Sequence, residues 1–188
     1  MFSLHRYHIF SSQSRVQGCR SFGGPSGDFH TIFKDFKDDS SVSFALVPAV
    51  RDPSGGCVDE DNCDYEKATV CAFSQLEIAK QVEFLACMDD SDDEALEAAK
   101  KCSSSTGVDA SKLESCFNGS DGNDLLEAAS KVWNKYEPGR AYIPKVLVNG
   151  EDEQSDRDNI INAICADGSS ASVCNGNVLS MTARFCAV

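Results

Sequence analysis

The residues of this chain best suited to chemistry are its ten cysteines, and their spacing excludes a dithiol redox motif. No two of them lie three positions apart, so the chain contains no Cys-x-x-Cys pair. The segment Val16-Gln17-Gly18-Cys19 has the length of such a pair but carries valine at its first position. Disulfide exchange by a dithiol needs an attacking thiolate and a second thiol that resolves the mixed disulfide. We therefore expect that Val16 has removed one of the two groups and that only Cys19 remains.

The number of cysteines favours an oxidising compartment. Ten cysteines in 188 residues are typical of secreted, disulfide-bonded proteins, because cytosolic thiols are kept reduced. The first six residues lack the apolar segment of a signal peptide, and we expect that a signal was removed and that Met1 was added for expression. The sequence thus predicts a single domain over residues 1–188, secreted or located in the endolysosomal lumen.

Charge and composition exclude several other functions. A net charge of −13 would repel nucleic acid, whereas at neutral pH it could attract a basic protein partner. No apolar run approaches the roughly 20 residues that a membrane-spanning helix needs. His5, His8 and His30 form no spaced metal-binding set with any cysteine pair, so we expect neither a metal nor another cofactor.

Hydrophobic periodicity predicts a strand, a helix and a second strand at the start of the chain. Residues Leu4–Phe10 alternate like a strand, and residues Ser41–Val50 read as a second one. Between them, hydrophobic side chains three or four apart predict a helix with one buried face: Phe29, Ile32, Phe33 and Phe36. Because a crossover of this kind is right-handed and joins parallel strands, we expect the two strands to be parallel neighbours.

The middle of the chain is predicted to be helical. One helix is expected over Asp64–Lys80 and a continuation over residues 82–88. Ser91 is expected to cap a helix that runs to Cys102, and Asp109 a helix that ends at Asn118-Gly119. A last helix should open at Asn123.

Strand pattern returns at Tyr142–Val148 and runs into Asn149-Gly150, a strong hairpin signal. A final helix is expected over Asp156–Cys165. The order β-α-β, helices, β-β-α is that of an α/β protein with a thioredoxin-like fold, a sheet of about four strands and a disulfide-rich helical insertion at about residues 57–136.

Three motifs resemble the gamma-interferon-inducible lysosomal thiol reductase family, over roughly residue 42 to the C-terminus. Cys57, Cys63 and Cys71 resemble the family's C-Q-H-G-x-x-E-C-x-x-N-x-x-x-x-C, although the first gap is one residue short and Glu66 occupies the asparagine position. The segment from Tyr142 to Gly150 is similar to Y-[VI]-P-W-V-x-V-N-G, and residues 46–48 are similar to the family's Leu-Val-Pro.

The resemblance also implies where the active site lies and how this chain departs from it. Family members carry C-P-x-C followed by Arg-x-Phe after the first strand. Cys19-Arg20-Ser21-Phe22 matches the end of that motif, which aligns Cys19 with the resolving cysteine and Val16 with the nucleophile. Three states stay open for Cys19: a structural half-cystine, a free buried thiol, or a working single thiol.

The same resemblance assigns further site residues. The proline at Pro144 is cis in proteins of this fold and faces the redox site, so Tyr142, Ile143 and Pro144 are candidates for binding an extended peptide. The remaining cysteines resemble the family's disulfide ladder: Cys57, Cys63, Cys71, Cys87, Cys102, Cys116, Cys165, Cys174 and Cys186.

The spacing of the cysteines supports two disulfide predictions, although it does not determine the whole connectivity. A turn at residues 88–91 should bring two helices together and allow Cys87 to bond with Cys102. Cys71 with Cys116 is a second candidate. Separately, Asn118-Gly119-Ser120 is an N-glycosylation sequon at a helix end, for which a helix cap is the alternative interpretation.

Two functions follow from these observations. In the first, the chain is a degenerate relative of a thiol reductase that acts by binding a protein, at the Ile143-Pro144 cleft or on the exposed faces of the insertion. In the second, it is a thiol-disulfide oxidoreductase that works through Cys19 alone. A reactive thiol of low pKa at Cys19 would favour the enzyme.

Overall fold

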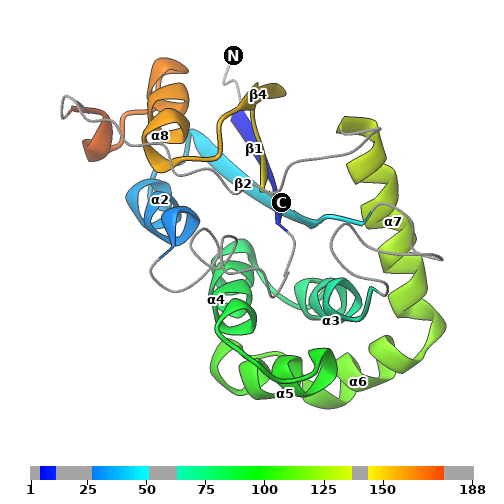
Figure 1. Cartoon of the computed structure of the whole chain (residues 1–188). Helices are drawn as coiled ribbons and strands as arrows, with labels where there is room; N and C mark the ends of the chain where they lie inside the picture. The colour runs from blue at the N-terminus through cyan, green and yellow to red at the C-terminus, as the bar shows by residue number, and fades with distance from the viewer. Residues whose placement is uncertain (1–4, 12–26, 51–62, 137–143, 176–188) are drawn as a thin grey trace.

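The computed structural model describes residues 5–11, 27–50, 63–136 and 144–175, and it has the expected sheet at its centre (Figure 1). Four strands are hydrogen-bonded in the order β2-β1-β3-β4. Their bounds are β1 His5–Ser11, β2 Val42–Pro48, β3 Lys145–Val148 and β4 Glu151–Glu153. β1 pairs with β2 in parallel and with β3 antiparallel, and β3 pairs with β4 antiparallel. The prediction that Tyr142–Val148 pairs beside the first strand is thus confirmed for its described part, Lys145–Val148.

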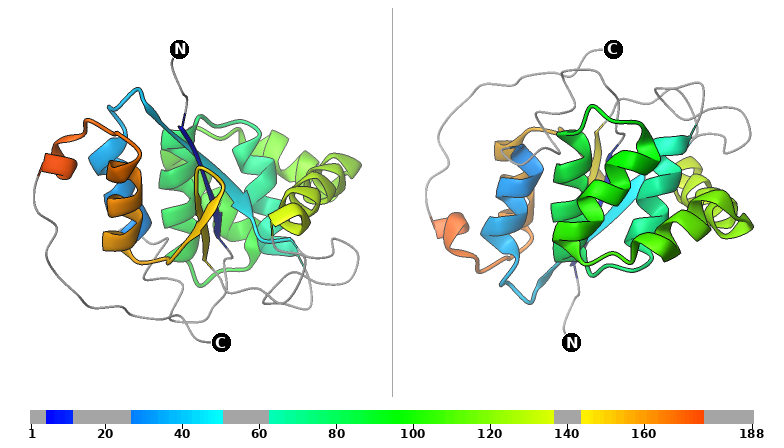
Figure 2. Two further views of the ribbon diagram at one scale, coloured as in Figure 1. Left: turned by 90° about the horizontal axis from the view of Figure 1, so that it is seen from above. Right: turned by 90° about the horizontal axis from the view of Figure 1, so that it is seen from below.

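Helices cover both faces of the sheet. Alternate residues of β3 point to opposite faces, and Val146 and Val148 pack with the hydrophobic side of α2 (Asp28–Phe36) and with α8 (Arg157–Ala166). Leu147 packs on the other face, against Trp133 of α7 (Ser120–Tyr136). Figure 2 shows the sheet between these helices from two further directions. The four side chains that predicted α2 are all buried: Phe29, Ile32, Phe33 and Phe36.

The helical insertion has a hydrophobic core of its own. The insertion consists of five helices: α3 (Asp64–Phe73), α4 (Ile78–Asp89), α5 (Ala95–Thr106), α6 (Ala110–Asn118) and α7. The short 3-10 helix η1 (Ser172–Asn175) follows α8 and lies outside the insertion in the sequence. Alanines and cysteines dominate this core, and small side chains let the helices approach closely, as at Ala68, Ala72, Ala98 and Ala99, all almost fully buried. Phe84 and Leu113 fill the remaining space. The insertion therefore folds against itself as well as against the sheet.

Several helix ends differ from the expected positions for local reasons. The helix expected over Asp64–Lys80 ends at Phe73, because the side-chain amide of Gln81 donates hydrogen bonds to the backbone carbonyls of Phe73 at 3.2 Å and Leu76 at 2.9 Å. The bond to Phe73 satisfies a carbonyl that the end of α3 leaves free, and the bond to Leu76 holds the segment that connects α3 to α4.

α5 also begins later in the chain than the sequence predicts. Ser91 does not cap this helix, which begins at Ala95; its hydroxyl oxygen instead accepts a hydrogen bond from the backbone amide of Asp93. The last helix of the insertion, α7, begins at Ser120 rather than Asn123. The cap at Asp109 is confirmed, because its carboxylate accepts hydrogen bonds from the amides of two residues in the first turn of α6.

Candidate functional site

The register of the strands brings three chain segments to one end of the sheet. Ser11, the last residue of β1, pairs with Pro48 at the end of β2, and Phe10 pairs with Lys145 at the start of β3. The segment that leaves β1 at this end carries Val16 and Cys19. Pro144 lies directly before β3 at the same end and is buried. This end of the sheet is therefore the candidate site.

Several residues predicted for the site fall outside the described part of the chain. These are Val16, Cys19, Tyr142 and Ile143, together with Cys57 and Cys186. The cis peptide bond before Pro144 involves Ile143, so it stays a prediction. What the structure contributes is the placement of the strands from which these segments start and to which they return.

Charged side chains lie next to Pro144. The ammonium group of Lys145 forms an ion pair with the carboxylate of Asp152, and its side chain is 15% exposed, whereas that of Asp152 is 64% exposed. The two residues lie diagonally across the β3–β4 hairpin, since Leu147 is the direct partner of Asp152. All three residues of β4 are acidic, and it forms an edge of the sheet. Among the described residues of this hairpin, the charges beside Pro144 are thus three carboxylates and one lysine that is paired with one of them.

Glu66 is a buried acid that the sequence analysis did not treat as a candidate site residue. It lies in the first turn of α3 and is only 3% exposed. One helical turn separates it from Cys63 and Val70, which pack with Val50, two residues beyond the end of β2. The signal in the sequence was its place at the asparagine position of the family motif. It lies on the side of α3 that faces the end of β2, where a carboxylate can hold a polar group in place.

The cysteines of the insertion form disulfides as predicted. Cys71 is bonded to Cys116 and Cys87 to Cys102, which confirms both predicted pairs. A third bridge joins Cys165 at the end of α8 to Cys174 in η1. Cys63 is disulfide-bonded as well. Every cysteine within the described ranges is therefore oxidised, and disulfides of this number form in an oxidising environment.

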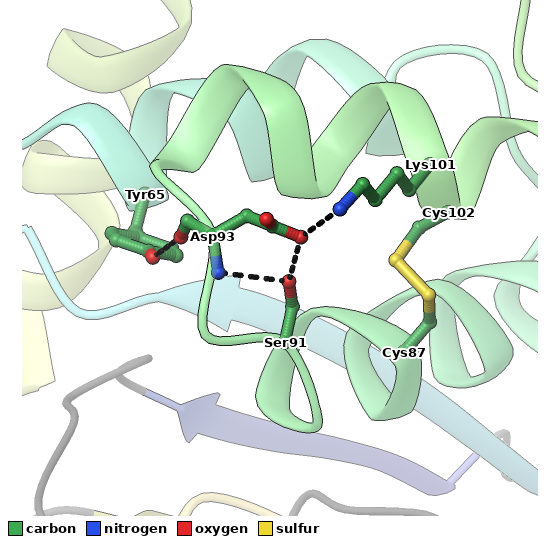
Figure 3. Close-up of polar contacts among 6 residues, drawn as sticks. All are labelled: Tyr65, Cys87, Ser91, Asp93, Lys101 and Cys102. Carbon is green, nitrogen blue, oxygen red and sulfur yellow. Dashed lines mark hydrogen bonds and ion pairs between the residues drawn. A yellow bond between two sulfur atoms is a disulfide. The ribbon is translucent and has the colours of Figure 1, made fainter.

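The Cys87–Cys102 bridge stands beside a polar network that fixes the loop between α4 and α5 (Figure 3). The hydroxyl of Tyr65 donates a hydrogen bond to the backbone carbonyl of Asp93. The ammonium group of Lys101 forms an ion pair with the side-chain carboxylate of Asp93 at 2.6 Å. Hydrogen bonds from Lys101 and then Ser91 lower the pKa of Asp93 below its ordinary value. This network ties α3, the loop and α5 together, and it has a structural role.

His30 is the histidine whose side chain the structure describes, and its buried Nδ1 has no hydrogen-bond partner among the described residues. Burial lowers the pKa of His30, as does the nearby positive charge of Lys34, while Glu83 acts in the opposite direction. Within residues 5–11, 27–50, 63–136 and 144–175, no group of three His, Cys, Asp or Glu side chains could hold a metal ion. In the same ranges, no helix is both long and apolar enough to cross a membrane.

Comparison with known proteins identifies the fold. No family model matches the chain, and no curated protein does. Among solved structures, it is similar to DsbA of Chlamydia trachomatis, with a TM-score of 0.66 and 17% identity over 88% of this chain and 87% of the other.

Two further structures agree. The oxidoreductase DsbA of Xylella fastidiosa has a TM-score of 0.56 and 16% identity, over 79% of this chain and 74% of its own. The disulfide bond oxidoreductase DsbG of Mycobacterium tuberculosis, in its reduced form, has a TM-score of 0.57 and 16% identity, over 87% of this chain and 76% of its own. The chain has the thioredoxin-like fold of these proteins, with its disulfide-rich helices inserted between β2 and β3.

Proposed function

We propose that this chain is a divergent member of the gamma-interferon-inducible lysosomal thiol reductase family that has lost dithiol chemistry and acts by binding a protein partner. The observation that carries the proposal is Val16, which stands three positions before Cys19 in the place of the attacking cysteine. A valine side chain has no group that can attack a disulfide. Because exchange requires both an attacking and a resolving thiol, one substitution is enough to stop turnover.

The state of the other cysteines supports this proposal. Each of the seven within the described ranges is already in a disulfide: Cys63, Cys71, Cys87, Cys102, Cys116, Cys165 and Cys174. None of these seven therefore offers a thiol that could take over from the missing nucleophile. Thiol chemistry, if any, depends on Cys19, Cys57 and Cys186.

The end of the sheet at Pro144 is the proposed binding surface. In this fold a peptide binds by pairing with the backbone before the proline, and such pairing needs no thiol. The adjacent strand β4 carries three carboxylates, and one of them, Asp152, is neutralised by Lys145. A partner segment that is extended and basic would match this surface, and its affinity should fall as salt is added.

The alternative function is a reductase that works through the single thiol of Cys19. The retained Cys19-Arg20-Ser21-Phe22 sequence favours it, because the resolving position of the family motif is intact. The two functions differ in the reactivity of the native protein toward an alkylating reagent. One rapidly modified cysteine at position 19 favours the enzyme, and the lack of any reactive thiol favours the binding protein.

An insulin-disulfide reduction assay at acidic and neutral pH tests the loss of chemistry. We expect wild-type protein to give no turnover above a control without enzyme, and Val16→Cys to gain activity. Val16→Cys combined with Cys19→Ser is the control, since it restores only the first thiol and should not sustain turnover. Wild-type turnover that Cys19→Ser abolishes would overturn the proposal in favour of the single-thiol enzyme.

Binding is tested separately with a lysine-rich peptide at low and high salt. Lys145→Gln removes the ammonium group that neutralises the already exposed Asp152, so we expect tighter binding of the basic peptide than for wild type. Lys131→Gln is the matched control, because Lys131 lies on α7, is 73% exposed and pairs with Glu127 in the same way. If both variants bind alike, the partner does not use the surface beside Pro144.

A further inference from the structure

The α6–α7 corner carries the chain's one Asn-x-Ser/Thr sequence, Asn118-Gly119-Ser120. Asn118 is the last residue of α6, and Ser120 is the first of α7. In Figure 1 the corner lies at the outer edge of the insertion, away from the strands. It is therefore well separated in the fold from the candidate site at Pro144.

The geometry at this corner argues against a helix cap as the role of Asn118. Its side chain is exposed and forms no hydrogen bond with another described residue. The backbone amide of Gly119, rather than the asparagine side chain, donates to the carbonyl of Cys116 at 3.2 Å. A capping asparagine would be expected to bond to the helix end, so the exposed amide of Asn118 has no structural task here.

The backbone at the corner also suits an acceptor site. Gly119 is extended, with φ −99° and ψ −175°, so the three residues do not continue as one helix. A Cβ atom at position 119 would lie 2.7 Å from the carbonyl oxygen of Ser115, which explains the glycine in the middle of the sequence. Ser120 is exposed, as is Asn118. Both side chains that a glycosyl transferase must recognise are thus accessible on a break between helices.

An open groove adjoins the corner. It has a volume of about 570 Å³ and lies between the end of α3, α6 and α7. Its lining includes Ser115 and Cys116, which precede Asn118 in the chain, and Asp121 and Asp124, which follow it. Among the described residues that line it, Lys112 is the one cationic side chain. Asn118 does not line the groove itself but lies in the chain between two residues that do, Cys116 and Asp121, so a bulky group attached to it would lie beside the groove.

We propose that Asn118 is N-glycosylated and that the glycan covers this groove, which removes the α6–α7 corner from the surfaces open to a protein partner. In the reaction, the side-chain amide nitrogen bonds to the anomeric carbon of an oligosaccharide carried on a lipid diphosphate. The bond from that carbon to the diphosphate oxygen breaks, the amide loses one proton, and nothing is oxidised or reduced. The chemistry requires a secretory host, which agrees with the oxidised cysteines.

The proposal is tested on the full chain secreted from a eukaryotic cell. We expect the intact mass to exceed the peptide mass by one glycan. After amidase treatment the mass of the glycan should be lost, and the small mass increase from asparagine to aspartate should remain at position 118. Asn118→Gln and Ser120→Ala should both lack the glycan, while their thermal unfolding should match that of enzymatically deglycosylated wild type. Secreted wild-type protein with an unmodified Asn118 would overturn the proposal.

Coverage of the groove is measured by acylation of lysines before and after deglycosylation. Lys112 should react severalfold more slowly in the glycosylated protein. Lys131, which is exposed on α7 and does not line the groove, is the internal control and should react at the same rate in both forms. Equal rates at Lys112 in the two forms would contradict the coverage, whatever the mass shows. Neither result depends on whether the chain reduces disulfides or binds a basic peptide.

Discussion

The three disulfides described here should stabilise the fold to different extents, and the order can be worked out from the structure. A disulfide restricts the unfolded chain, and in the chain-entropy model its effect grows with the length of the loop that it closes. Cys71–Cys116 closes 45 residues, Cys87–Cys102 closes 15, and Cys165–Cys174 closes 9. At 25 °C these loops correspond to about 4, about 3 and about 2.5 kcal/mol of folding free energy.

The first two bridges are nested, because Cys87 and Cys102 both lie between Cys71 and Cys116. With the inner bridge closed, the outer loop shortens to about 30 residues, which lowers its contribution by about 0.3 kcal/mol. The order of the three bridges does not change. Since whole domains are stable by only about 5–15 kcal/mol, loss of the outer bridge alone would remove a large share of the total.

The assay is equilibrium unfolding in urea, monitored by the fluorescence of the buried Trp133. Each bridge is removed by a double alanine variant, and the three free energies of unfolding are compared with wild type. We expect the loss of unfolding free energy to be largest for Cys71→Ala/Cys116→Ala and smallest for Cys165→Ala/Cys174→Ala. If removal of the nine-residue bridge costs more than removal of the 45-residue bridge, loop entropy does not govern these disulfides.

Three further predictions concern single residues. Hydrogen bonds from the side chain of Ser41, and then from that of Ser169, hold the pKa of Asp39 well below its ordinary value of 3.8. The ionised carboxylate therefore stabilises the fold above pH 3.8, and this stabilisation is lost progressively as the pH falls below 3.8. Urea unfolding at pH 3–6 should therefore show Asp39→Asn less stable than wild type at the upper end, with a difference that narrows below about pH 4. In Gly122→Ala the new Cβ would lie 2.6 Å from a backbone carbonyl oxygen, and thermal unfolding should show a loss of about 1–3 kcal/mol. Gly150→Ala places a side chain at φ +90°, and denaturant titration should show a loss of about 1–2 kcal/mol.

The parts of the fold that could be predicted are those encoded locally. The spacing of four hydrophobic side chains gives α2 its buried face, and Asn149-Gly150 adopts the positive φ angles, 53° and 90°, that a tight hairpin requires. The break between α3 and α4 could not be read in this way, because no glycine or proline marks it. It depends on Gln81, which reaches back from the next helix to the carbonyls of Phe73 and Leu76.

The candidate site was predictable in its position but not in its charge. The order of strands placed Pro144 beside the end of β1, and the sequence motif pointed to the same place. The pairing of Lys145 with Asp152 depends on the register across the hairpin, and the burial of Glu66 depends on how α3 packs against α7 and the end of β2. Both are tertiary effects that no local pattern contains.

The contacts of β3 bear on the proposal that the end of the sheet at Pro144 binds a partner without thiol chemistry. β3 is held by backbone hydrogen bonds to β1 and β4, and its side chains are held by apolar packing on both faces. Leu147 rests on Trp133, which is completely buried, and on Ala49 beyond the end of β2. Backbone pairing and dispersion contacts do not depend on a reactive thiol, so a substitution at the attacking position leaves this support in place.

The large-to-small variant Trp133→Ala removes the packing under Leu147. We expect this variant to lose about 3–5 kcal/mol of stability and to bind peptide more weakly, whereas Cys19→Ser should leave peptide binding unchanged. A loss of peptide binding in Cys19→Ser as large as that in Trp133→Ala would mean that the thiol contributes to the surface and that the frame of the sheet alone does not make it.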